Sequence, residues 1–332
     1  MAPVREQYLD PDYVPEVLPH REGEVAEVFE LLKPLVEGRR ATNVFLCGPA
    51  GIGKTAVAKF VMREFSEQAV QGIYINCWYH RTEVAVLTEA LRQLSYPVPR
   101  KGRSVDELVG EFIQNISGER LVFVLDEVDA LTDDGVLYVL SRTGLPVGVV
   151  MVSNDPYAMR KFDQRVKSSL SPVTVEFERY SVGELFDILE ERARLAFQDY
   201  DPMAVKVAAR LSYKHGSDVR YGLNLLLRAG RLAGKMGQRL EVQHVKGVEV
   251  REDPKKERRQ GELEGEHRLV VEALKTLGGR ALSPELFARY RKIGGKGAER
   301  TFRKYVKELI ELQVLDSEEL PGRGKRRVLK LR

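Results

Sequence analysis

The stretch Gly48-Pro49-Ala50-Gly51-Ile52-Gly53-Lys54-Thr55 fits the pattern G-x-x-x-x-G-K-[ST] of the P-loop, a phosphate-binding motif. The run 42–47 before it predicts a buried strand, and the apolar spacing over 56–63 behind it predicts a helix. In this setting the glycines let backbone N–H groups surround a phosphate, and the helix N-terminus adds a favourable dipole. A glycine-rich turn can match the motif by chance, but strand, loop and helix together predict a nucleoside triphosphate site.

Separate roles follow for the residues of this loop. Lys54 is expected to bring a mobile positive charge to the β- and γ-phosphates, and Thr55 is expected to hold Mg²⁺ through its hydroxyl. The predicted cofactors are therefore ATP or ADP together with Mg²⁺. The loop residues predicted to bind the nucleotide are Pro49, Ala50, Gly51, Ile52, Gly53, Lys54 and Thr55.

A second motif supplies the acidic groups that hydrolysis needs. The run 121–125 predicts a central strand buried on both faces, and Asp126 and Glu127 follow where that strand would end. Ligands of open α/β sheets bind at the carboxyl ends of the strands, so Asp126 is expected near the Mg²⁺ held by Thr55. Glu127 is then placed to orient and polarise the attacking water. An acidic surface turn is the alternative interpretation, because three further aspartates follow closely, but the P-loop argues against it.

Length and composition limit the class of protein. The 332 residues predict two or three domains, and the 43% hydrophobic and 31% charged content is typical of a globular protein. No apolar run approaches the roughly 18 residues of a membrane span, and the start of the chain lacks the profile of a signal peptide. With only Cys47 and Cys77, neither a disulfide framework nor a zinc site is expected. We therefore predict a cytoplasmic protein without a membrane partner.

The order of the predicted elements indicates an α/β core followed by helices. Helical patterns alternate with strand patterns, which favours right-handed crossovers and a parallel sheet. The strands are expected over 43–47, 72–77, 121–125, 148–152 and 173–177. From Ser181, which forms a capping box with Glu184, the pattern is wholly helical to about residue 236. The predicted domains are a nucleotide-binding core (1–178), a helical lid (179–250), a linker (251–263) and a C-terminal domain (264–332).

The C-terminal domain has the pattern of a winged helix. Three amphipathic helices, over 266–277, 282–292 and 299–313, precede a strand, a turn and a second strand. Residues 264–332 carry 17 Lys and Arg against 10 Asp and Glu, whereas the rest of the chain has a net charge of −3. This basic domain predicts a polyanion partner, and double-stranded DNA suits a winged helix. A winged helix used for protein contacts is the alternative interpretation.

Basic residues gather on two parts of this domain. On the third helix Phe302, Val306, Leu309 and Ile310 share one face, which leaves the basic residues available to a major groove. The turn between the last two strands forms a basic wing tip that can reach phosphates or a minor groove. The residues predicted to bind DNA are Arg300, Arg303, Lys304 and Lys307 on the helix and Arg323, Lys325, Arg326 and Arg327 on the wing.

With P-loop, helical lid and winged helix in this order, the chain resembles the archaeal Orc1/Cdc6 replication initiators of the AAA+ class. The resemblance covers nearly the whole chain. The matching segments are 18–22 (Leu-Pro-His-Arg-Glu), 126–131 (Asp-Glu-Val-Asp-Ala-Leu) and the lid entry from Tyr180-Ser181 through 188–192. In the lid motif the chain has Ser217 and Val219 where the family prefers Gly and Ala. The resemblance implies an AAA+ P-loop parallel sheet, an all-helical lid and a C-terminal winged helix.

The resemblance also implies roles for residues outside the P-loop. Asn154 would bond the γ-phosphate or the lytic water, Arg220 of the lid would touch the γ-phosphate, and Arg165 would be the finger offered to a neighbour's ATP. The adenine would be bordered by Leu18, His20 and Arg21. The implied catalytic residues are thus Glu127, Asn154, Arg165 and Arg220.

Each of these roles has an alternative in the sequence. Asn154 precedes an Asp-Pro pair and suits an ordinary turn, and Arg220 has acidic neighbours with which it can pair. The family usually has proline just before the finger arginine, where this chain has Gln164 ahead of Arg165. Other basic residues lie nearby as substitutes, namely Arg160, Lys161 and Lys167.

The implied function is that of a slow ATPase in the initiation of DNA replication. ATP would close the lid on the core and set how the protein grips origin DNA, with turnover as a switch. The replicative helicase and further copies of the protein on DNA are the implied partners. The alternative is a signalling P-loop ATPase whose winged helix is an internal protein-binding clamp without a basic wing. A transcription regulator with ATP as effector differs only in its target sequence.

Overall fold

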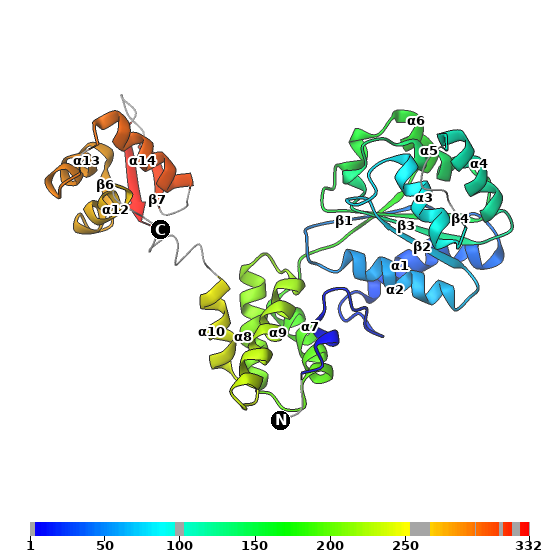
Figure 1. Cartoon of the computed structure of the whole chain (residues 1–332), viewed down its shortest axis with the longest axis horizontal. Helices are drawn as coiled ribbons and strands as arrows, with labels where there is room; N and C mark the ends of the chain where they lie inside the picture. The colour runs from blue at the N-terminus through cyan, green and yellow to red at the C-terminus, as the bar shows by residue number, and fades with distance from the viewer. Residues whose placement is uncertain are drawn as a thin grey trace. The chain divides into compact units, whose positions relative to one another are not determined.

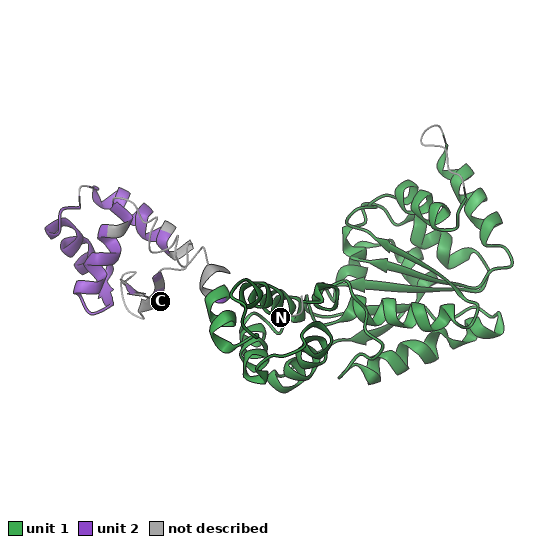
Figure 2. Ribbon diagram, turned by 60° about the horizontal axis from the view of Figure 1, so that its bottom comes forward, with its two compact units in different colours: residues 1–248 green, residues 249–332 purple. Residues whose placement is uncertain are grey.

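The computed structural model describes residues 4–96, 103–252, 266–295, 297–311, 315–320 and 326–331. The chain forms two compact units, residues 1–248 and residues 249–332, which Figure 2 shows in green and purple. Each unit has its own hydrophobic core. The finer domain boundaries expected from the sequence stay predictions, and most of the predicted linker lies outside the described residues.

The first unit contains a five-stranded parallel sheet (Figure 1). Its strands are β1 (Val44–Cys47), β2 (Gln71–Asn76), β3 (Leu121–Asp126), β4 (Val147–Ser153) and β5 (Val173–Glu176), in the order β2-β3-β4-β1-β5. β3 and β4 are buried along their whole length, because they are central strands with helices on both faces. The predicted α/β core is confirmed, with its strands at the expected places.

Helices cover both faces of this sheet (Figure 1). On one face lie α1 (Glu22–Leu32) and α2 (Lys54–Ser66); on the other lie α3 (Glu83–Gln93), α4 (Val105–Ile116), α5 (Gly135–Arg142) and α6 (Gln164–Leu170). Successive residues of a strand point to opposite faces, so Val122 and Val124 of β3 join the core beneath α2, whereas Phe123 joins the other core. The same alternation turns Asp126 toward Thr55 at the start of α2.

The first helix is shorter than its sequence pattern predicts. The apolar spacing predicts a helix over roughly 22–37, but α1 ends at Leu32 and a 3-10 helix, η2 (Lys33–Glu37), continues the chain. Pro34, the second residue of η2, lacks the N–H group that a continuing α-helix would need. The described residues include three further 3-10 helices, η1 (Glu6–Leu9), η3 (Val128–Ala130) and η4 (Ala158–Lys161).

A helical bundle follows the sheet. It consists of α7 (Val182–Ala196), α8 (Pro202–Lys214), α9 (Val219–Lys235) and α10 (Val242–Glu252). The predicted capping box at the start of α7 is formed, since Ser181 and Glu184 each accept the other's backbone N–H. Asp201 caps α8 ahead of Pro202 at its first position. The all-helical pattern is confirmed, and α10 extends it beyond the predicted residue 236.

In the described part of residues 266–331, three helices combine with a small antiparallel sheet. The elements are α12 (Glu266–Thr276), β6 (Arg280–Leu282), α13 (Ser283–Lys292), α14 (Glu299–Glu311), β7 (Leu315–Leu320) and β8 (Arg326–Leu331), with the strands in the order β6-β8-β7. This is the predicted winged helix. The sequence did not predict β6, because three residues between a glycine pair and a helix start carry no strand periodicity. Among the helices that the structure describes, none has the length and apolar content needed to cross a bilayer.

Candidate functional site

The predicted P-loop connects β1 to α2. Gly51 and Gly53 have φ angles of 76° and 96°, in the left-handed region that favours glycine. A Cβ atom on Gly51 would lie 2.1 Å from a carboxylate oxygen of Asp218, so a larger residue there would displace the Asp218 side chain. Because α2 begins at Lys54, the loop leads directly into a helix N-terminus, the arrangement that binds phosphate.

The ammonium group of Lys54 is held inside the loop. Lys54 is 5% exposed, and its Nζ donates to two P-loop carbonyl groups, at 2.8 and 2.5 Å, and to Oδ1 of Asn154 at 2.9 Å. Burial lowers the pKa of Lys54 to about 8; Asp126 opposes this shift and Arg220 adds to it. An anion bound at the loop would stabilise the charged form of this lysine.

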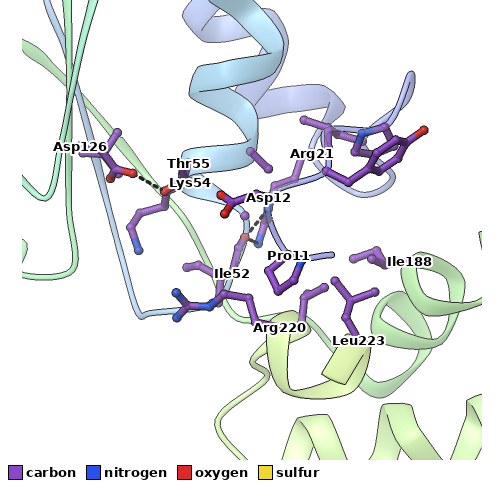
Figure 3. A pocket seen from close by; sticks show the side chains of 18 of the residues that line it. Pro11, Asp12, Arg21, Ile52, Lys54, Thr55, Asp126, Ile188, Arg220 and Leu223 are labelled. Atoms are coloured by element: carbon purple, nitrogen blue, oxygen red, sulfur yellow. Dashed lines mark hydrogen bonds between the residues drawn. The ribbon is translucent and has the colours of Figure 1, made fainter. Parts of the chain in front are cut away.

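Asp126 and Thr55 form the pair of oxygen ligands expected for a metal. Thr55 Oγ1 donates to Asp126 Oδ2 at 2.9 Å (Figure 3). Mg²⁺ prefers oxygen ligands and in nucleotide sites is bound through one or two protein groups together with phosphates and water. The hydroxyl and the carboxylate fit that ion when a nucleotide is bound with it. Within the described residues, no cluster of His, Cys, Asp or Glu could hold a metal without such help.

Glu127 follows β3 in an unusual backbone conformation. Its φ of 53° lies in the left-handed region, which costs a residue with a side chain about 1–2 kcal/mol. The side chain lines the same cavity as Lys54 and Asp126. Burial raises the pKa of Glu127, and the negative charges of Asp126 and Asp129 raise it further. A carboxylate of raised pKa is suited to accept a proton from water.

The N-terminus of α9 closes against the P-loop. The N–H of Val219 donates to the carbonyl of Gly51 at 3.0 Å, and Asp218 caps the helix beside that glycine. Arg220, in the first turn of α9, lines the cavity, and Figure 3 shows it on the side of Ile52. Its Nε lies 3.4 Å from Asp218 Oδ1. Arg220 thus borders the cavity and also pairs with an acidic neighbour, and its contact with a γ-phosphate stays a prediction.

Arg21 braces the P-loop from the other side. It is 6% exposed, and its guanidinium donates to the carbonyl of Ile52 through Nε at 3.2 Å and Nη2 at 3.1 Å. Nη2 also donates to the carbonyl of Glu178 at 2.8 Å, and the group lies 4.0 Å from the ring centroid of Tyr180. Arg21 and Leu18 line the cavity as expected. The contacts of Arg21 fix the backbone of the loop to the end of β5.

Three predicted nucleotide-binding residues do not line this cavity. Pro49 and Ala50 belong to the first half of the P-loop, and the cavity lining begins with Gly51. His20 points to α7, where its Nε2 lies 2.9 Å from Asp187 Oδ2 and its Nδ1 lies 4.0 Å from Glu184 Oε1. The two carboxylates on α7 hold the imidazole outside the cavity lining, and the expected contact of His20 with the base stays a prediction.

Sequence reasoning missed an N-terminal arm, residues 4–15, that borders the cavity. Its segment 11–13 lies between α2 and the helical bundle (Figure 3). Arg192 of α7 holds the arm, because its guanidinium donates to the carbonyls of Asp10 at 2.7 Å and Tyr13 at 3.3 Å, and to that of Tyr8. A buried arginine that binds backbone carbonyls leaves no periodicity in the sequence. The only signal was the arginine itself in the lid-entry segment.

The cavity formed by these elements has a volume of about 330 Å³, within the range of small-molecule sites. Its two ends differ in chemistry. Lys54, Thr55 and Asp126 form a charged end at the carboxyl edge of the sheet, whereas Ile188 and Leu223 of the bundle contribute apolar side chains (Figure 3). A charged end for phosphates and an apolar end for a base together suit a nucleotide.

Arg165 lies apart from this cavity. It occupies the first turn of α6, is exposed, and its backbone N–H is capped by Asp163 at 2.7 Å. Two of the basic residues named as alternatives to Arg165 contact other groups of the same chain. Lys161 donates to the carbonyls of Asp129 and Leu131, the latter at 2.9 Å, and the guanidinium of Arg160 lies 4.1 Å from a tyrosine ring centroid. Arg165 does not line the cavity of its own chain, and its role as a finger stays a prediction.

The third helix of the second unit separates its apolar and basic faces. Phe302, Val306 and Leu309 of α14 are buried at 1%, 8% and 0% exposure. The four basic residues expected to meet DNA are all exposed: Arg300, Arg303, Lys304 and Lys307. Arg303 Nη2 donates to Oε1 of Glu299, one turn earlier, at 2.6 Å. The helix thus presents a basic surface to the solvent, as the spacing predicts.

The basic wing is described only in part. Arg323 and Lys325 lie outside the described residues. Arg326 and Arg327 begin β8, where their backbones pair with Leu320 and Glu319 of β7.

Comparisons with known proteins agree with this architecture. A family model described as an AAA domain matches residues 37–152, and a model of the Cdc6 AAA+ ATPase-type lid domain matches residues 186–249. The structure of the Aeropyrum pernix ORC1 protein in complex with DNA is 31% identical, with a TM-score of 0.69, and the match covers 98% of this chain and 92% of that one. The chain belongs to the Orc1/Cdc6 family of AAA+ P-loop ATPases.

Other Orc1/Cdc6 proteins show the same relationship. The ORC1-type DNA replication protein 1 of Sulfurisphaera tokodaii is 38% identical over 260 residues, which cover 74% of this chain and 65% of that protein. The corresponding protein of A. pernix is 35% identical over 71% of this chain and 65% of its own length. The chain therefore matches slightly less than two thirds of these curated relatives. The structure of Cdc6p from Pyrobaculum aerophilum, at 21% identity and a TM-score of 0.66 over 99% of this chain and 94% of that one, shares the fold.

One departure from the Orc1/Cdc6 lid motif has a structural explanation. Ser217 stands where the family prefers glycine, and its φ of 65° is in the left-handed region that glycine adopts without strain. Ser217 is 1% exposed, and its Oγ donates to the carbonyl of Tyr180 at 2.8 Å. This hydrogen bond offsets part of the backbone strain and ties the start of α9 to the start of α7. The approach of Arg220 to the P-loop is preserved.

Proposed function

We propose that this Orc1/Cdc6 protein is an ATP-regulated, DNA-binding initiator of DNA replication that recognises origin DNA. The proposal combines a core (1–178), a helical lid (179–250), a linker (251–263) and a winged helix (264–332). The relative from A. pernix, solved in complex with DNA, supports the DNA part, and the P-loop cavity supports the nucleotide part. Origin DNA and ATP are thus the two ligands whose binding is coupled.

The cavity supports ATP or ADP as the nucleotide. Its apolar end, with Leu18, Ile188 and Leu223, offers a place for the base. Its charged end offers the P-loop and Lys54 to the phosphates. Arg21 acts indirectly in this proposal, because it holds the carbonyl of Ile52 and so keeps the loop in shape.

Slow hydrolysis would use the acidic pair at the end of β3. Asp126 and Thr55 would hold Mg²⁺, which neutralises charge on the β- and γ-phosphates when it is bound. Glu127, with its raised pKa, would orient and deprotonate the attacking water. Asn154 is placed beside Lys54 and would bond the γ-phosphate or that water.

Arg220 would report which nucleotide is bound. It lies on the first turn of α9, whose backbone already contacts Gly51, and it pairs weakly with Asp218. A γ-phosphate would compete with Asp218 for the guanidinium and draw the lid onto the core. ADP has no γ-phosphate and leaves this contact unmade. Lid position would then be the signal passed to the DNA-binding surfaces.

Contacts with other chains complete the proposal. Arg165 is exposed on α6 and would act as a finger for the ATP of a neighbouring copy on DNA. Recruitment of the replicative helicase is the output that membership of the Orc1/Cdc6 family favours. The basic face of α14 and the wing would hold the duplex, the first through its groove and the second through phosphates.

The single observation that carries the proposal is the cavity bounded by the P-loop on one side and by α9 on the other. The test measures binding to origin and unrelated duplexes by fluorescence anisotropy with ATP, ADP or no nucleotide. We expect tighter binding to origin DNA and a change in DNA affinity with ATP, and no effect of ATP in Lys54→Ala. Equal affinity for all duplexes in all nucleotide states would reject the proposal. ATP turnover without any DNA binding would favour the signalling clamp instead.

A further inference from the structure

Tyr74 of β2 brings a phenol hydroxyl to the carboxylate of Asp126. Tyr74 OH donates to Asp126 Oδ2 at 2.7 Å, the same oxygen that accepts a hydrogen bond from Thr55 at 2.9 Å. The other oxygen, Oδ1, accepts the backbone N–H of Glu127 at 2.9 Å. Three donors from three segments of the chain therefore hold this carboxylate in one orientation.

The register of the sheet explains why a tyrosine can reach so far. Tyr74 pairs with Val124 of β3, so Asp126 lies two residues further along the neighbouring strand and on the same face. Neighbouring strands lie about 4.8 Å apart and rise about 3.3 Å per residue, so an offset of two residues separates the Cα atoms by roughly 8 Å, which an aromatic side chain can bridge. A serine or threonine at position 74 would be too short to make the contact.

The tyrosine is itself held in place. β2 is an edge strand of the five-stranded sheet. On its open side, the side chain of Gln93 of α3 forms hydrogen bonds with the backbone of Tyr74. Gln93 Oε1 accepts the N–H of Tyr74 at 3.1 Å, and Gln93 Nε2 donates to its carbonyl at 2.8 Å. The ammonium group of Lys59 lies 4.8 Å from the ring centroid. Both the backbone and the ring of Tyr74 are therefore constrained.

Packing alone does not account for the hydroxyl. The ring of Tyr74 packs against the core beneath α2, and a phenylalanine would fill the same space. Taking a hydroxyl out of water is costly unless it is hydrogen-bonded. Here the bond is made to a group that already has Thr55 and a backbone N–H as donors. The Tyr74 hydroxyl therefore helps to fix the orientation of the Asp126 carboxylate. A fixed orientation is useful only where the direction of the carboxylate oxygens matters.

We propose that Tyr74 is a positioning residue that orients Asp126 toward Mg²⁺ and so sets the metal affinity of the nucleotide site. The inference rests on the proposed function, because it concerns the same site. Tyr74 acts through Asp126 and does not contact the reacting atoms. Residues that orient a metal ligand in this way typically change metal affinity or activity by about 10–100-fold when they are removed.

The test compares Tyr74→Phe with the parent protein and with Tyr200→Phe. Tyr200 also donates its hydroxyl to a carboxylate, Glu190 Oε1 at 2.9 Å, but on the helical bundle and outside the cavity. Affinity for a fluorescent ATP analogue is measured in EDTA and across a Mg²⁺ titration, and ATP turnover is measured across the same titration. Thermal unfolding without nucleotide checks that each variant is folded.

We expect Tyr74→Phe to bind the analogue like the parent in EDTA and to need about ten-fold more Mg²⁺ for half-maximal binding and turnover. Mn²⁺, which binds oxygen and nitrogen ligands more tightly than Mg²⁺ does, should restore much of the loss, and Tyr200→Phe should behave like the parent. An unchanged Mg²⁺ requirement in Tyr74→Phe would overturn the inference. So would an equal loss of affinity in EDTA, since that would indicate a packing role. Failure of the parent itself to bind the analogue would instead reject the proposed function.

Discussion

Nζ of Lys54 donates to Oδ1 of Asn154 at 2.9 Å, although the two residues are separated by 100 positions in the chain. Lys54 begins α2 and Asn154 follows β4, the strand next to β1 in the sheet. The contact places the cation of the P-loop and the amide of Asn154 at one point, where a γ-phosphate would meet both. A bound phosphate would therefore compete with Asn154 for the ammonium group. The charge of Lys54 determines whether the phosphate displaces Asn154.

ATP affinity should fall above pH 8. Burial lowers the pKa of Lys54 to about 8, so without nucleotide this lysine loses its proton near that pH. Phosphates favour the charged form, and binding must therefore take up a proton at higher pH. The affinity should drop from about pH 8 upward, by at most about ten-fold per pH unit. Titration calorimetry in EDTA at a series of pH values measures it.

Lys54→Arg is the matched control for this pH dependence. Arginine keeps its charge throughout the range. The ATP affinity of the Lys54→Arg variant should therefore not change between pH 8 and pH 10, whatever its value at pH 7. A parent protein whose ATP affinity stays constant over the same range would show that Lys54 does not titrate, and would contradict the prediction.

Glu127→Gln should bind ATP like the parent and lose most of its turnover. The amide keeps the shape of the side chain but cannot take a proton from water, and general-base catalysis typically contributes about 10²–10⁴-fold. Single-turnover measurements with radiolabelled ATP separate binding from hydrolysis. Glu119→Gln, an exposed position before β3, is the control. Parental turnover in Glu127→Gln would move the base to another residue.

The part of the site that could be predicted from the sequence is the part made by local patterns. Glycine spacing between a strand and a helix defines the P-loop, and an apolar run that ends in two acids defines β3 and Asp126. These signals are contained in short segments, so they need no knowledge of the rest of the chain. Arg220 and Asn154 required the resemblance, because a single polar residue after a helix cap or a strand is common in loops.

The parts that were missed depend on contacts between distant segments. Arg192 binds carbonyls of the arm more than 170 positions earlier, and Tyr74 reaches Asp126 through the register of two strands. The contacts of His20 with two carboxylates on α7 were likewise not predicted. None of these contacts leaves a periodicity, since each depends on how elements pack rather than on how they form.

Arg220→Ala should reduce the preference for ATP over ADP more than it reduces nucleotide binding overall. Only ATP offers a γ-phosphate to the lid, and a charge-assisted hydrogen bond is typically worth about 1.5–3 kcal/mol. Affinities for ATP and ADP are measured side by side. Arg239→Ala, an exposed lid arginine beside Glu241, is the control. An equal loss of affinity for both nucleotides would indicate that Arg220 is structural.

Arg165→Ala should lower ATP turnover only where copies of the protein meet. The residue is exposed and does not line the cavity of its own chain, so the proposed role is on a neighbour's nucleotide. Turnover per protein is measured over a concentration series and on DNA carrying several sites. We expect a loss at high concentration or on such DNA, and none for the dilute protein. Lys167→Ala, on the same helix, tests the remaining substitute; a loss in that variant alone would transfer the role to Lys167.

Removing a wing charge and removing a helix charge should affect DNA binding differently. Arg327 begins β8 beside the wing turn, and if it neutralises a phosphate, Arg327→Ala should lower the log–log salt slope by about 1 and weaken all duplexes alike. Arg303 is exposed on α14. If it reads a base, Arg303→Ala should weaken DNA binding by about 1–3 kcal/mol through that one base position, and specificity at that position should relax.

Both DNA effects are measured by anisotropy over a range of salt concentrations, with single-base variants of the site. Lys275→Ala, an exposed basic residue on α12, serves as a control for the general loss of positive charge. The wing contacts are tested most severely by removing Arg323, Lys325, Arg326 and Arg327 together. If that variant keeps the parental affinity and salt slope, the wing does not meet DNA, and the winged helix would then serve protein contacts as in the signalling-clamp alternative.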